Sequence, residues 1–315
     1  MSHLVDQTRP TILVTGACGR LGKHVVRLLH RHARVLSVDR RAFPDKPADV
    51  EHARLDLRRS KLKDLFRAHR IGAVVHLGIM HDPRISSAEH HSWNVGGLQR
   101  LLECVSRYEV PKLVLLSSAN VYGPRPDNPQ FLSEESPLLA AARFAEVRDL
   151  VELDMMAQGF FWRRPATETV ILRPCHILGT VRNAASNYLR LDPVPTLLGF
   201  DPLVQVVHER DVAQAIVAAL TPGRRGIFNI AGPDPLPLSY AVRRLGKRTL
   251  PVPHTLVAFT LRRMFKLGLT RFLDPELDHI RYVCMVDDRR AREELGYRPA
   301  HNLNETLHAV LSESL

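Results

Sequence analysis

The sequence predicts an α/β fold, in which a doubly wound parallel sheet is joined to a smaller C-terminal lid. Over the first 175 residues, short runs rich in Val, Ile and Leu alternate with helical patterns, and such alternation is typical of this fold class. The apolar runs also lack strict apolar–polar alternation, which indicates strands that are buried on both faces of a sheet. After residue 175 the regular alternation breaks, which indicates a second structural unit.

The expected elements follow one another in a regular order. We expect strands at residues 11–15, 34–39, 72–77, 112–118 and 169–174. We expect helices at residues 20–32, 59–69, 87–108 and 138–158. Each helical pattern is followed by a strand pattern, as a parallel sheet with crossover helices requires.

The second unit has a less regular sequence pattern. Pro193, Pro195 and Pro202 interrupt the stretch that follows the last strand of the first unit. A core-like unit then returns, with helical and strand patterns, before a mostly helical C-terminal part. We therefore expect a core made of residues 1–175 and 204–232, and a lid made of residues 176–203 and 233–315.

Composition narrows the class of partner. The chain has 315 residues, of which 45% are hydrophobic and 24% charged, with 44 Lys and Arg against 33 Asp and Glu. The resulting net charge of +11 favours anionic partners such as nucleotides and sugar phosphates. The basic residues are scattered, and no zinc-finger spacing or RNA-binding aromatic signature is present, so we do not expect nucleic-acid binding.

Cysteine usage and hydropathy bear on location. Cys18, Cys104, Cys175 and Cys284 form no CxxC pair and no metal spacing with histidine, which predicts reduced thiols, no metal site and a cytoplasmic protein. The polar N-terminus does not resemble a signal peptide, and no apolar run approaches the roughly 20 residues that span a bilayer. Residues 254–272 mix apolar and basic side chains; we favour a lid helix there, with peripheral contact to anionic lipid as the alternative.

A glycine-rich loop follows the first expected strand directly. Gly16, Gly19 and Gly22 lie between that strand and a helix, where glycines let the backbone approach a pyrophosphate bound at the helix N-terminus. Asp39 ends the second strand about 20 residues further on, the place of an acid that accepts hydrogen bonds from the adenine-ribose hydroxyls. The sequence therefore predicts a dinucleotide site.

The choice between NAD and NADP depends on the residues around Asp39. A carboxylate repels a 2′-phosphate and so favours NAD, whereas the neighbouring Arg40 and Arg41 have the chemistry that a 2′-phosphate prefers. We expect NAD, with NADP as the alternative. In that case the two arginines are solvated loop charges.

Motifs along the rest of the chain occur in a characteristic order. They are LDL (55–57), VVHLG (74–78), NVGGLQRLLE (94–103), SSANVYG (117–123), RPCHILG (173–179), VHERDVAQAI (207–216), FNIAG (228–232) and LGYRP (295–299). Together they resemble the extended branch of the short-chain dehydrogenase/reductase superfamily, the NAD-dependent epimerases and dehydratases, and within it the UDP-glucose 4-epimerase-like group. The resemblance spans nearly the whole chain. It implies a Rossmann-type core, a substrate-binding lid, a nucleotide-sugar substrate and a homodimer.

The resemblance also implies site residues. It places a catalytic serine at Ser118, an active-site asparagine at Asn94 and an adenine contact at Asp56. The implied cofactor contacts are Gly16, Cys18, Gly19, Arg20, Leu21, Gly22, Asp39, Arg40, Asp56, Leu57, Leu77, Gly78, Ser117, Arg148 and Pro174.

The catalytic helix departs from the family pattern. In the family a tyrosine takes the proton of a sugar hydroxyl while hydride passes to the nicotinamide, and a lysine four residues on lowers the tyrosine pKa. These positions fall on Phe144 and Arg148. Phenylalanine transfers no proton, and arginine is no base at neutral pH because its pKa stays above about 12.

Ordinary structural roles also suit the two substituted positions. The spacing of Phe144, Val147 and Val151 is typical of a core-facing stripe, and Arg148 can pair with Glu152 or hydrogen-bond the nicotinamide ribose. The Tyr108–Lys112 pair has the family spacing but lies before the serine segment and contains a proline, so we reject it as the catalytic pair.

A substitute base would have to come from elsewhere. The candidates are His81, Asp82, Glu135 and His176. Two hypotheses follow. The chain is either an epimerase-like oxidoreductase with an altered catalytic pair, or a dinucleotide-binding protein that has lost catalysis and acts as a sensor, scaffold or assembly partner.

Overall fold

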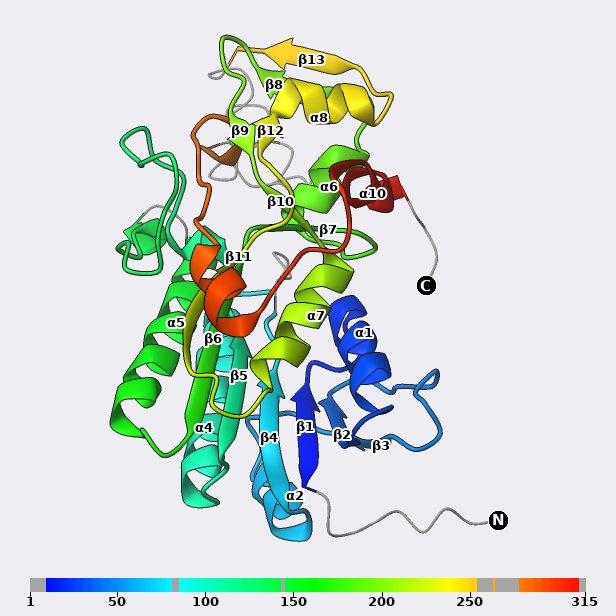
Figure 1. Ribbon diagram of the computed structural model, residues 1–315, viewed down its shortest axis with the longest axis vertical. Helices are drawn as coiled ribbons and strands as arrows, with labels where there is room; N and C mark the ends of the chain where they lie inside the picture. Colours follow the sequence, from blue (N-terminus) through cyan, green and yellow to red (C-terminus); the bar gives the residue numbers. More distant parts are fainter. Residues whose placement is uncertain (1–9, 81–84, 143–144, 254–262, 264–277, 312–315) are drawn as a thin grey trace.

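A seven-stranded parallel sheet forms the centre of the described part of the chain (Figure 1). The computed structural model describes residues 10–80, 85–142, 145–253, 263 and 278–311. The strands are β1 (Thr11–Thr15), β2 (Arg34–Asp39), β3 (Glu51–Arg54), β4 (Ile71–His76), β5 (Lys112–Leu116), β6 (Glu168–Pro174) and β11 (Gly226–Ile230). Their spatial order is β11-β6-β5-β4-β1-β2-β3.

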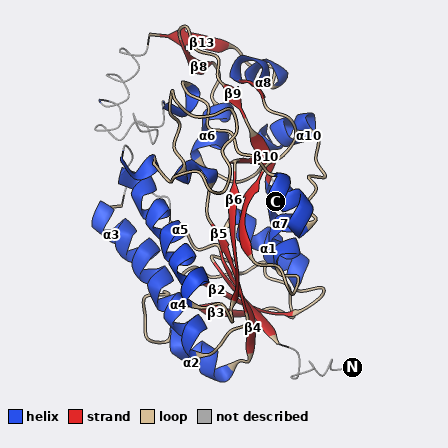
Figure 2. Ribbon diagram, turned by 60° about the vertical axis from the view of Figure 1, so that its left-hand side comes forward, coloured by secondary structure: helices blue, strands red, loops and turns tan. Residues whose placement is uncertain are grey.

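Helices cover both faces of this sheet, as Figure 2 shows. One face carries α1 (Arg20–Leu29) and α7 (Glu209–Ala219). The other carries α2 (Leu62–Ala68), α4 (Gly97–Arg107) and α5 (Ala145–Arg163). The prediction of a doubly wound α/β fold is therefore confirmed.

The strand order creates a switch point beside β1. From β1 the chain first builds outward through β2 and β3, and it then returns to the other side of β1 to place β4, β5, β6 and β11. In open parallel sheets, ligands bind at the carboxyl ends of the strands where the order reverses. Here the reversal lies between β1 and β4, and the glycine-rich loop follows β1 at this point.

Several elements differ in extent from the sequence predictions. The strand expected at 112–118 ends at Leu116, because Ser118 already accepts a hydrogen bond from the Asn120 backbone and caps a short 3-10 turn. The helix expected at 87–108 is divided into α3 (Ser87–His91), a π-helical turn (Ser92–Gly96) and α4. Strand β3 lies at the sheet edge, and none of its four residues is fully buried. Its polar sequence therefore gives only a weak strand pattern.

A second cluster of buried apolar side chains belongs to the elements drawn above the sheet in Figure 1. It draws on β7 (His176–Leu178), α6 (Ala184–Arg190), β8 (Val194–Leu197), β10 (Val206–His208), β12 (Leu236–Pro237), α8 (Leu238–Arg244) and α10 (Leu303–His308). Short pairs join β8 to β13 (Thr249–Val252), and β12 to β9 (Leu203–Val204). Between these segments the chain returns to the sheet, where Val286, Ala291 and Tyr297 pack in the central core.

Two further points concern the helices. Within the described residues, no helix is long and apolar enough to cross a membrane. The basic amphipathic stretch expected at residues 254–272 lies, apart from Arg263, outside the described residues.

Candidate active site

The glycine-rich loop is packed too closely for any side chain. Gly16 has a φ of 71°, in the left-handed region, and a Cβ there would lie 2.7 Å from the Gly78 nitrogen on the neighbouring strand end. A Cβ on Gly22 would collide with the Gly16 carbonyl oxygen. Both glycines are therefore needed to bring the loop, the strand end and α1 together.

The N-terminus of α1 points into the same place. Its cap residue, Gly19, offers no side-chain acceptor, and the first turn of the helix contains no acidic residue. The first amides of a helix need acceptors, and its dipole favours an anion there. The loop thus fits the pyrophosphate of a dinucleotide, and Arg20 begins the helix at this point.

Asp39 ends β2 beside this loop and is almost fully buried. One oxygen accepts hydrogen bonds from the Cys18 backbone at 3.0 Å and from Arg41 Nη2 at 3.2 Å. The other accepts from the Arg41 backbone nitrogen and from Arg41 Nε. Burial opposes ionisation of Asp39, but these hydrogen bonds hold its pKa below the ordinary value, so Asp39 is a carboxylate.

The predicted adenine contacts lie at the end of β3. Asp56 accepts three hydrogen bonds from the Arg58 guanidinium, which together with its backbone contact hold the pKa of Asp56 low despite burial. The Arg58 guanidinium lies 4.0 Å from the centre of the Trp93 ring, and that of Arg40 lies 5.0 Å from it. Leu57 packs into the sheet core and approaches Gly97 at the start of α4.

The end of β4 is held by two internal contacts. Thr15 Oγ1 lies 2.7 Å from His76 Nδ1, and burial lowers the pKa of His76 to about 4, so this imidazole is neutral. Asn94 accepts a hydrogen bond from the Met80 nitrogen at 2.8 Å and donates one to the Met80 oxygen at 3.2 Å. The predicted active-site asparagine thus fixes the backbone that follows Leu77 and Gly78.

The two predicted serines have different surroundings. Ser117 is buried and donates a 2.6 Å hydrogen bond to Asp154 of α5, so its hydroxyl is engaged inside the protein. Ser118 is half-buried at the carboxyl end of β5, two residues beyond the last residue paired between β5 and β6. It is the hydroxyl of the pair that is open to a ligand at this edge.

Arg148 lies on the exposed face of α5, in its first turns. Val151 is buried in the core and Val147 packs against it, as the predicted apolar stripe requires. Glu152 lies 3.7 Å from His91. Phe144, like His81 and Asp82, lies outside the described residues.

The remaining tyrosine alternatives are excluded by geometry. Lys112 begins β5 and bonds Glu168 and two backbone oxygens, at the opposite end of the strand from Ser118. Tyr108 stacks on Phe66 in the core. Tyr122 donates to Asn229, and burial raises the pKa of Tyr122 to about 12, so it is no base at neutral pH.

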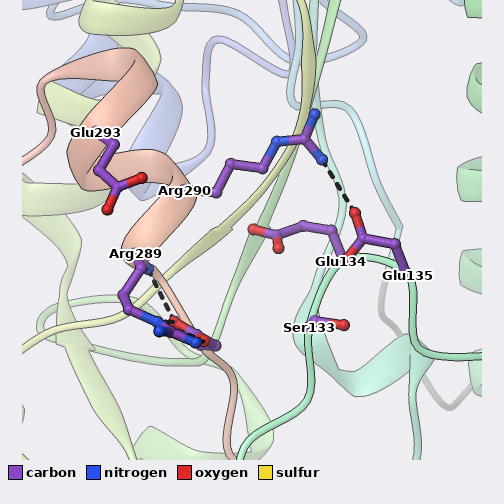
Figure 3. Close-up of a pocket in the computed structure, with 7 residues that line it drawn as sticks. Ser133, Glu134, Glu135, Arg289, Arg290 and Glu293 are labelled. Atoms are coloured by element: carbon purple, nitrogen blue, oxygen red, sulfur yellow. Dashed lines mark hydrogen bonds and ion pairs between the residues drawn. The ribbon is translucent and has the colours of Figure 1, made fainter.

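The two described candidates for a substitute base lie in different places. His176 begins β7, two residues after the end of β6, and forms an edge-to-face ring pair with His279, 5.3 Å between centroids. Burial lowers the pKa of His176 to about 4. Glu135 lines a separate open hollow of about 370 Å³ with Ser133, Glu134, Asp287, Arg289, Arg290 and Glu293 (Figure 3). That hollow contains none of the predicted cofactor residues, and Glu135 lies 3.4 Å from Arg290 there.

Sequence reasoning missed a buried polar network beneath the serines. Arg173 and Asp154 form a two-pronged pair at 2.7 and 2.9 Å, both fully buried. Arg173 also donates to the Tyr122 hydroxyl and to the Glu134 carbonyl oxygen. The only signal in the sequence was a charged residue inside each of two apolar patterns. Arg58 and Trp93, which flank the adenine contacts, were also missed.

One cluster of metal-ligand types occurs among the described residues. His91, Asp149 and Glu152 place one ligand atom each within 4.8 Å of one another at the junction of α3 and α5. His91 lies 3.1 Å from the Asp149 carboxylate, so the contact is an ordinary ion pair when the histidine is charged.

Sequence comparisons agree with this geometry. The sequence model of the NAD-dependent epimerase/dehydratase family matches residues 12–231. An uncharacterized protein of Mycobacterium tuberculosis is 32% identical over 302 residues, which cover 91% of this chain and 80% of that protein. UDP-glucose 4-epimerase 2 of Oryza sativa is 30% identical over 225 residues, which cover 64% of this chain and 53% of the rice protein.

Solved structures show the same fold. UDP-glucose 4-epimerase of Thermotoga maritima with UDP-glucose superposes with a TM-score of 0.74 at 20% identity, covering 96% of this chain and 98% of that one. UDP-glucose 4-epimerase of Thermus thermophilus in complex with NAD gives 0.72 at 22% identity, covering 96% and 98%. Since the family's own sequence pattern spans most of the sheet and its glycine-rich loop, this chain belongs to the NAD-dependent epimerase/dehydratase family.

Proposed function

We propose that this protein is an NAD-binding oxidoreductase that acts on a nucleotide sugar, with a non-standard catalytic pair. The observation that carries the proposal is the arrangement along one sheet edge. The close-packed Gly16 loop, the Asp39 carboxylate and the half-buried Ser118 lie at the carboxyl ends of β1, β2 and β5, three parallel strands of one sheet. That edge is where a dinucleotide and a substrate meet in such folds.

Each part of the edge has a proposed task. The amides at the start of α1 hold the pyrophosphate, Asp39 accepts from the adenine ribose, and Asp56 contacts the adenine. The remaining contacts of the proposed cofactor site are Cys18, Gly19, Arg20, Leu21, Gly22, Arg40, Leu57, Leu77, Gly78, Ser117, Arg148 and Pro174. When bound, the nicotinamide supplies a hydride acceptor.

The substrate side is less complete in this chain than in the family pattern. Ser118 donates its hydrogen bond to the reacting oxygen, and Asn94 keeps the neighbouring backbone in place through Met80. Arg148 places a guanidinium group at the position of the family lysine, but arginine does not act as a base at neutral pH. Proton transfer then depends on a group other than Phe144. Of the two described candidates, Glu135 and His176, we favour His176, because it lies two residues after the end of β6.

The substrate class and setting are part of the same proposal. Related structures include an epimerase with UDP-glucose, and the basic balance of this chain suits an anionic nucleotide sugar. Residues 176–203 and 233–315 form the proposed lid over the sheet edge. The four free cysteines support a cytoplasmic location, and a homodimer remains a prediction.

A second function is favoured by one observation. The positions of the family's tyrosine and lysine are occupied by phenylalanine and arginine, neither of which acts as a base at neutral pH, whereas the dinucleotide loop is intact. A protein that binds dinucleotide without turnover, as a sensor, scaffold or assembly partner, has this combination.

Calorimetry and turnover assays separate the two functions. We expect wild-type protein to bind NAD, and Gly22→Ala to abolish binding because its methyl group collides with the Gly16 oxygen. Gly96→Ala is the matched control, since a Cβ there meets no atom within 4 Å. Absence of dinucleotide binding by the wild type contradicts both functions.

Turnover is then measured with a panel of nucleotide sugars, as isomerised product or reduced cofactor. If the protein is an enzyme, Ser118→Ala lowers kcat by about 100-fold, the usual effect of removing one hydrogen bond to a reacting oxygen, and leaves the NAD affinity unchanged. Tight NAD binding with no turnover across the panel favours the second function.

A further inference from the structure

Three side chains of metal-binding types converge where α3 meets α5. His91 ends α3, while Asp149 and Glu152 lie three residues apart on α5, which places their carboxylates on one face of that helix. His91 Nδ1 lies 3.1 Å from Asp149 Oδ1 and 3.7 Å from Glu152 Oε2. One ligand atom of each residue lies within 4.8 Å of the other two. Because His91 and Asp149 are 58 residues apart in the sequence, no short motif marks this cluster.

The spacing of the three ligand atoms suits a single metal ion. A four-coordinate ion holds nitrogen and oxygen ligands at about 2.1 Å, which places two such ligand atoms about 3.4 Å apart. The two contacts of His91 lie on either side of that value. The side chain of Asp149 is only 9% exposed, so its carboxylate is held in place. The side chain of Glu152 is 43% exposed and can close the remaining distance by rotation.

The charge of the cluster also favours a cation. Two carboxylates face one imidazole, and a neutral imidazole leaves them without a counter-charge. Arg58 reaches Ser92, the neighbour of His91, but its guanidinium is paired with Asp56. A divalent ion supplies the missing positive charge, and it binds the nitrogen lone pair that a neutral imidazole offers.

We propose that His91, Asp149 and Glu152 form a site for a divalent metal ion of the zinc class. One nitrogen and two oxygen ligands suit zinc, whereas magnesium and calcium prefer oxygen ligands throughout. The bound ion joins α3, and with it the π-helical turn that carries Asn94, to the first turns of α5, which carry Arg148. It therefore fixes the distance between two elements of the candidate site. This inference depends on neither dinucleotide binding nor turnover.

The experiment uses the full chain after a chelator has removed metal ions. Calorimetry with zinc chloride should show that the tightest binding step takes one ion per chain, whereas magnesium chloride at the same concentration should not bind. Cobalt chloride gives a spectroscopic readout, because the visible absorption of Co²⁺ strengthens when a four-coordinate site replaces its shell of six waters. Zinc should also slow the hydrogen exchange of the amides of residues 87–96, since the ion ties this segment to α5.

Two variants remove one ligand each, and a third is the matched control. Glu152→Gln and His91→Ala should each lower the zinc affinity by about tenfold or more, since even the outer-shell partners of metal ligands contribute that much. Both should also lose the zinc-dependent protection of residues 87–96. His30→Ala is the control, because His30 also lies 3.1 Å from a carboxylate, that of Asp49, but this pair belongs to no group of three metal ligands among the described residues. It should leave zinc binding unchanged.

Two outcomes overturn the inference. If the wild type binds zinc no more tightly than magnesium, the three residues form an ion pair only. If Glu152→Gln binds zinc within a factor of two of the wild type, the ion is held elsewhere, among the 16 histidines of the chain. Circular dichroism identifies any loss of folding in His91→Ala, and Glu152→Gln, which keeps the size of a partly exposed side chain, then tests the same site independently.

Discussion

At the scale of single residues, the serine segment depends on a buried ion pair. Arg173 of β6 and Asp154 of α5 have almost no exposed surface, and Ser117 and Gln158 also donate hydrogen bonds to Asp154. Pairing in the interior compensates the loss of hydration only while both partners remain. The Ser117–Asp154 hydrogen bond and this ion pair therefore connect the end of β5 to α5 and β6.

Replacing one partner of the Arg173–Asp154 pair should lower the free energy of unfolding far more than replacing both. Asp154→Ala leaves the Arg173 guanidinium buried without its counter-ion, so the free energy of unfolding should fall by about 3–5 kcal/mol. The double variant Asp154→Leu with Arg173→Met should recover much of that loss. Urea denaturation measures both. A loss below about 1 kcal/mol for the single variant would contradict a buried pair.

The residue scale is also where sequence reasoning succeeds and fails most clearly. The glycines and Asp39 could be predicted because their backbone and charge requirements are local to one loop. The partners of Asp154 could not, because they depend on which distant side chains the fold brings within hydrogen-bond distance. The contact of Arg41 with Asp39, two residues away, was missed for another reason: it depends on the side-chain conformation of Arg41, which was expected to be a solvated loop charge.

At the scale of elements, helix α5 offers a test of the proposed catalytic pair. If the predicted register is right, Phe144→Tyr with Arg148→Lys restores a proton acceptor and the cation that lowers its pKa. Turnover of a nucleotide sugar should then rise by about 100-fold or more, the usual contribution of a general base.

The matched control for this pair is Tyr108→Phe, which alters the other tyrosine at the family spacing. It should leave turnover unchanged, because Lys112 lies at the far end of β5. An inactive Phe144→Tyr, Arg148→Lys variant that still binds NAD would show that the register assigned to this helix is wrong.

The N-terminus of α7 provides a second prediction at this scale. Glu209 accepts hydrogen bonds from the Thr180 backbone and hydroxyl and from the Val181 backbone, and it lies 3.4 Å from His24. Burial opposes its ionisation, yet the contact with His24 and the Thr180 hydrogen bonds lower the pKa of Glu209 to about 2.

Because the folded-state pKa of Glu209 is depressed, its contribution to stability is present above about pH 4.5 and is lost as the pH falls toward 2. Glu209→Gln should therefore lower the free energy of unfolding at pH 7, on the order of 3 kcal/mol. The difference from the wild type should narrow only below about pH 4.5. Denaturant titrations between pH 7 and 3.5 check this; a difference that is constant with pH would contradict it.

Elements with apolar, locally repeated patterns were predicted well, and the exceptions have physical causes. The bounds of β1 and β2 match the expected strands because their residues are buried on both faces. The π-helical turn at Ser92–Gly96 was not expected, because the helical pattern continues on both sides of it and such turns are rare. That turn carries Asn94, so the irregular part of the helix is the part that belongs to the site.

At the scale of the whole molecule, buried neutral histidines connect stability to pH. Burial lowers the pKa of His76, His176 and His208 to about 4 and that of His279 to about 3. The unfolded chain binds these protons near pH 6.5. Between pH 6.5 and 4 the unfolded chain is protonated at these histidines and the folded chain is not. The stability that the neutral histidines contribute is therefore fully present above about pH 6.5 and is lost as the pH falls toward 4.

The free energy of unfolding should accordingly fall steadily between pH 6.5 and 4. His76→Asn should reduce the slope of that decline, whatever its effect on stability at pH 7.5, because one proton fewer is excluded by folding. His308→Asn, at an exposed position, should not change the slope. Equal slopes for the wild type and His76→Asn would contradict a neutral His76 in the fold.

The order of the motifs along the chain predicted the family better than any single motif did. Eight short segments from residue 55 to residue 299 implied the family that the comparison over residues 12–231 shows. What the order could not supply is the identity of the group that takes a proton, because that depends on which distant side chains the fold brings together at the site.

The polar anchor of α5 lies at Asp154, about one and a half turns beyond Arg148. The first turns hold the helix as well, since Val151 is buried in the core and Asp149 lies 3.1 Å from His91. Arg148 itself lies on the exposed face and takes no part in the Arg173–Asp154 pair. A different side chain at position 148 is therefore compatible with the same helix in the same place.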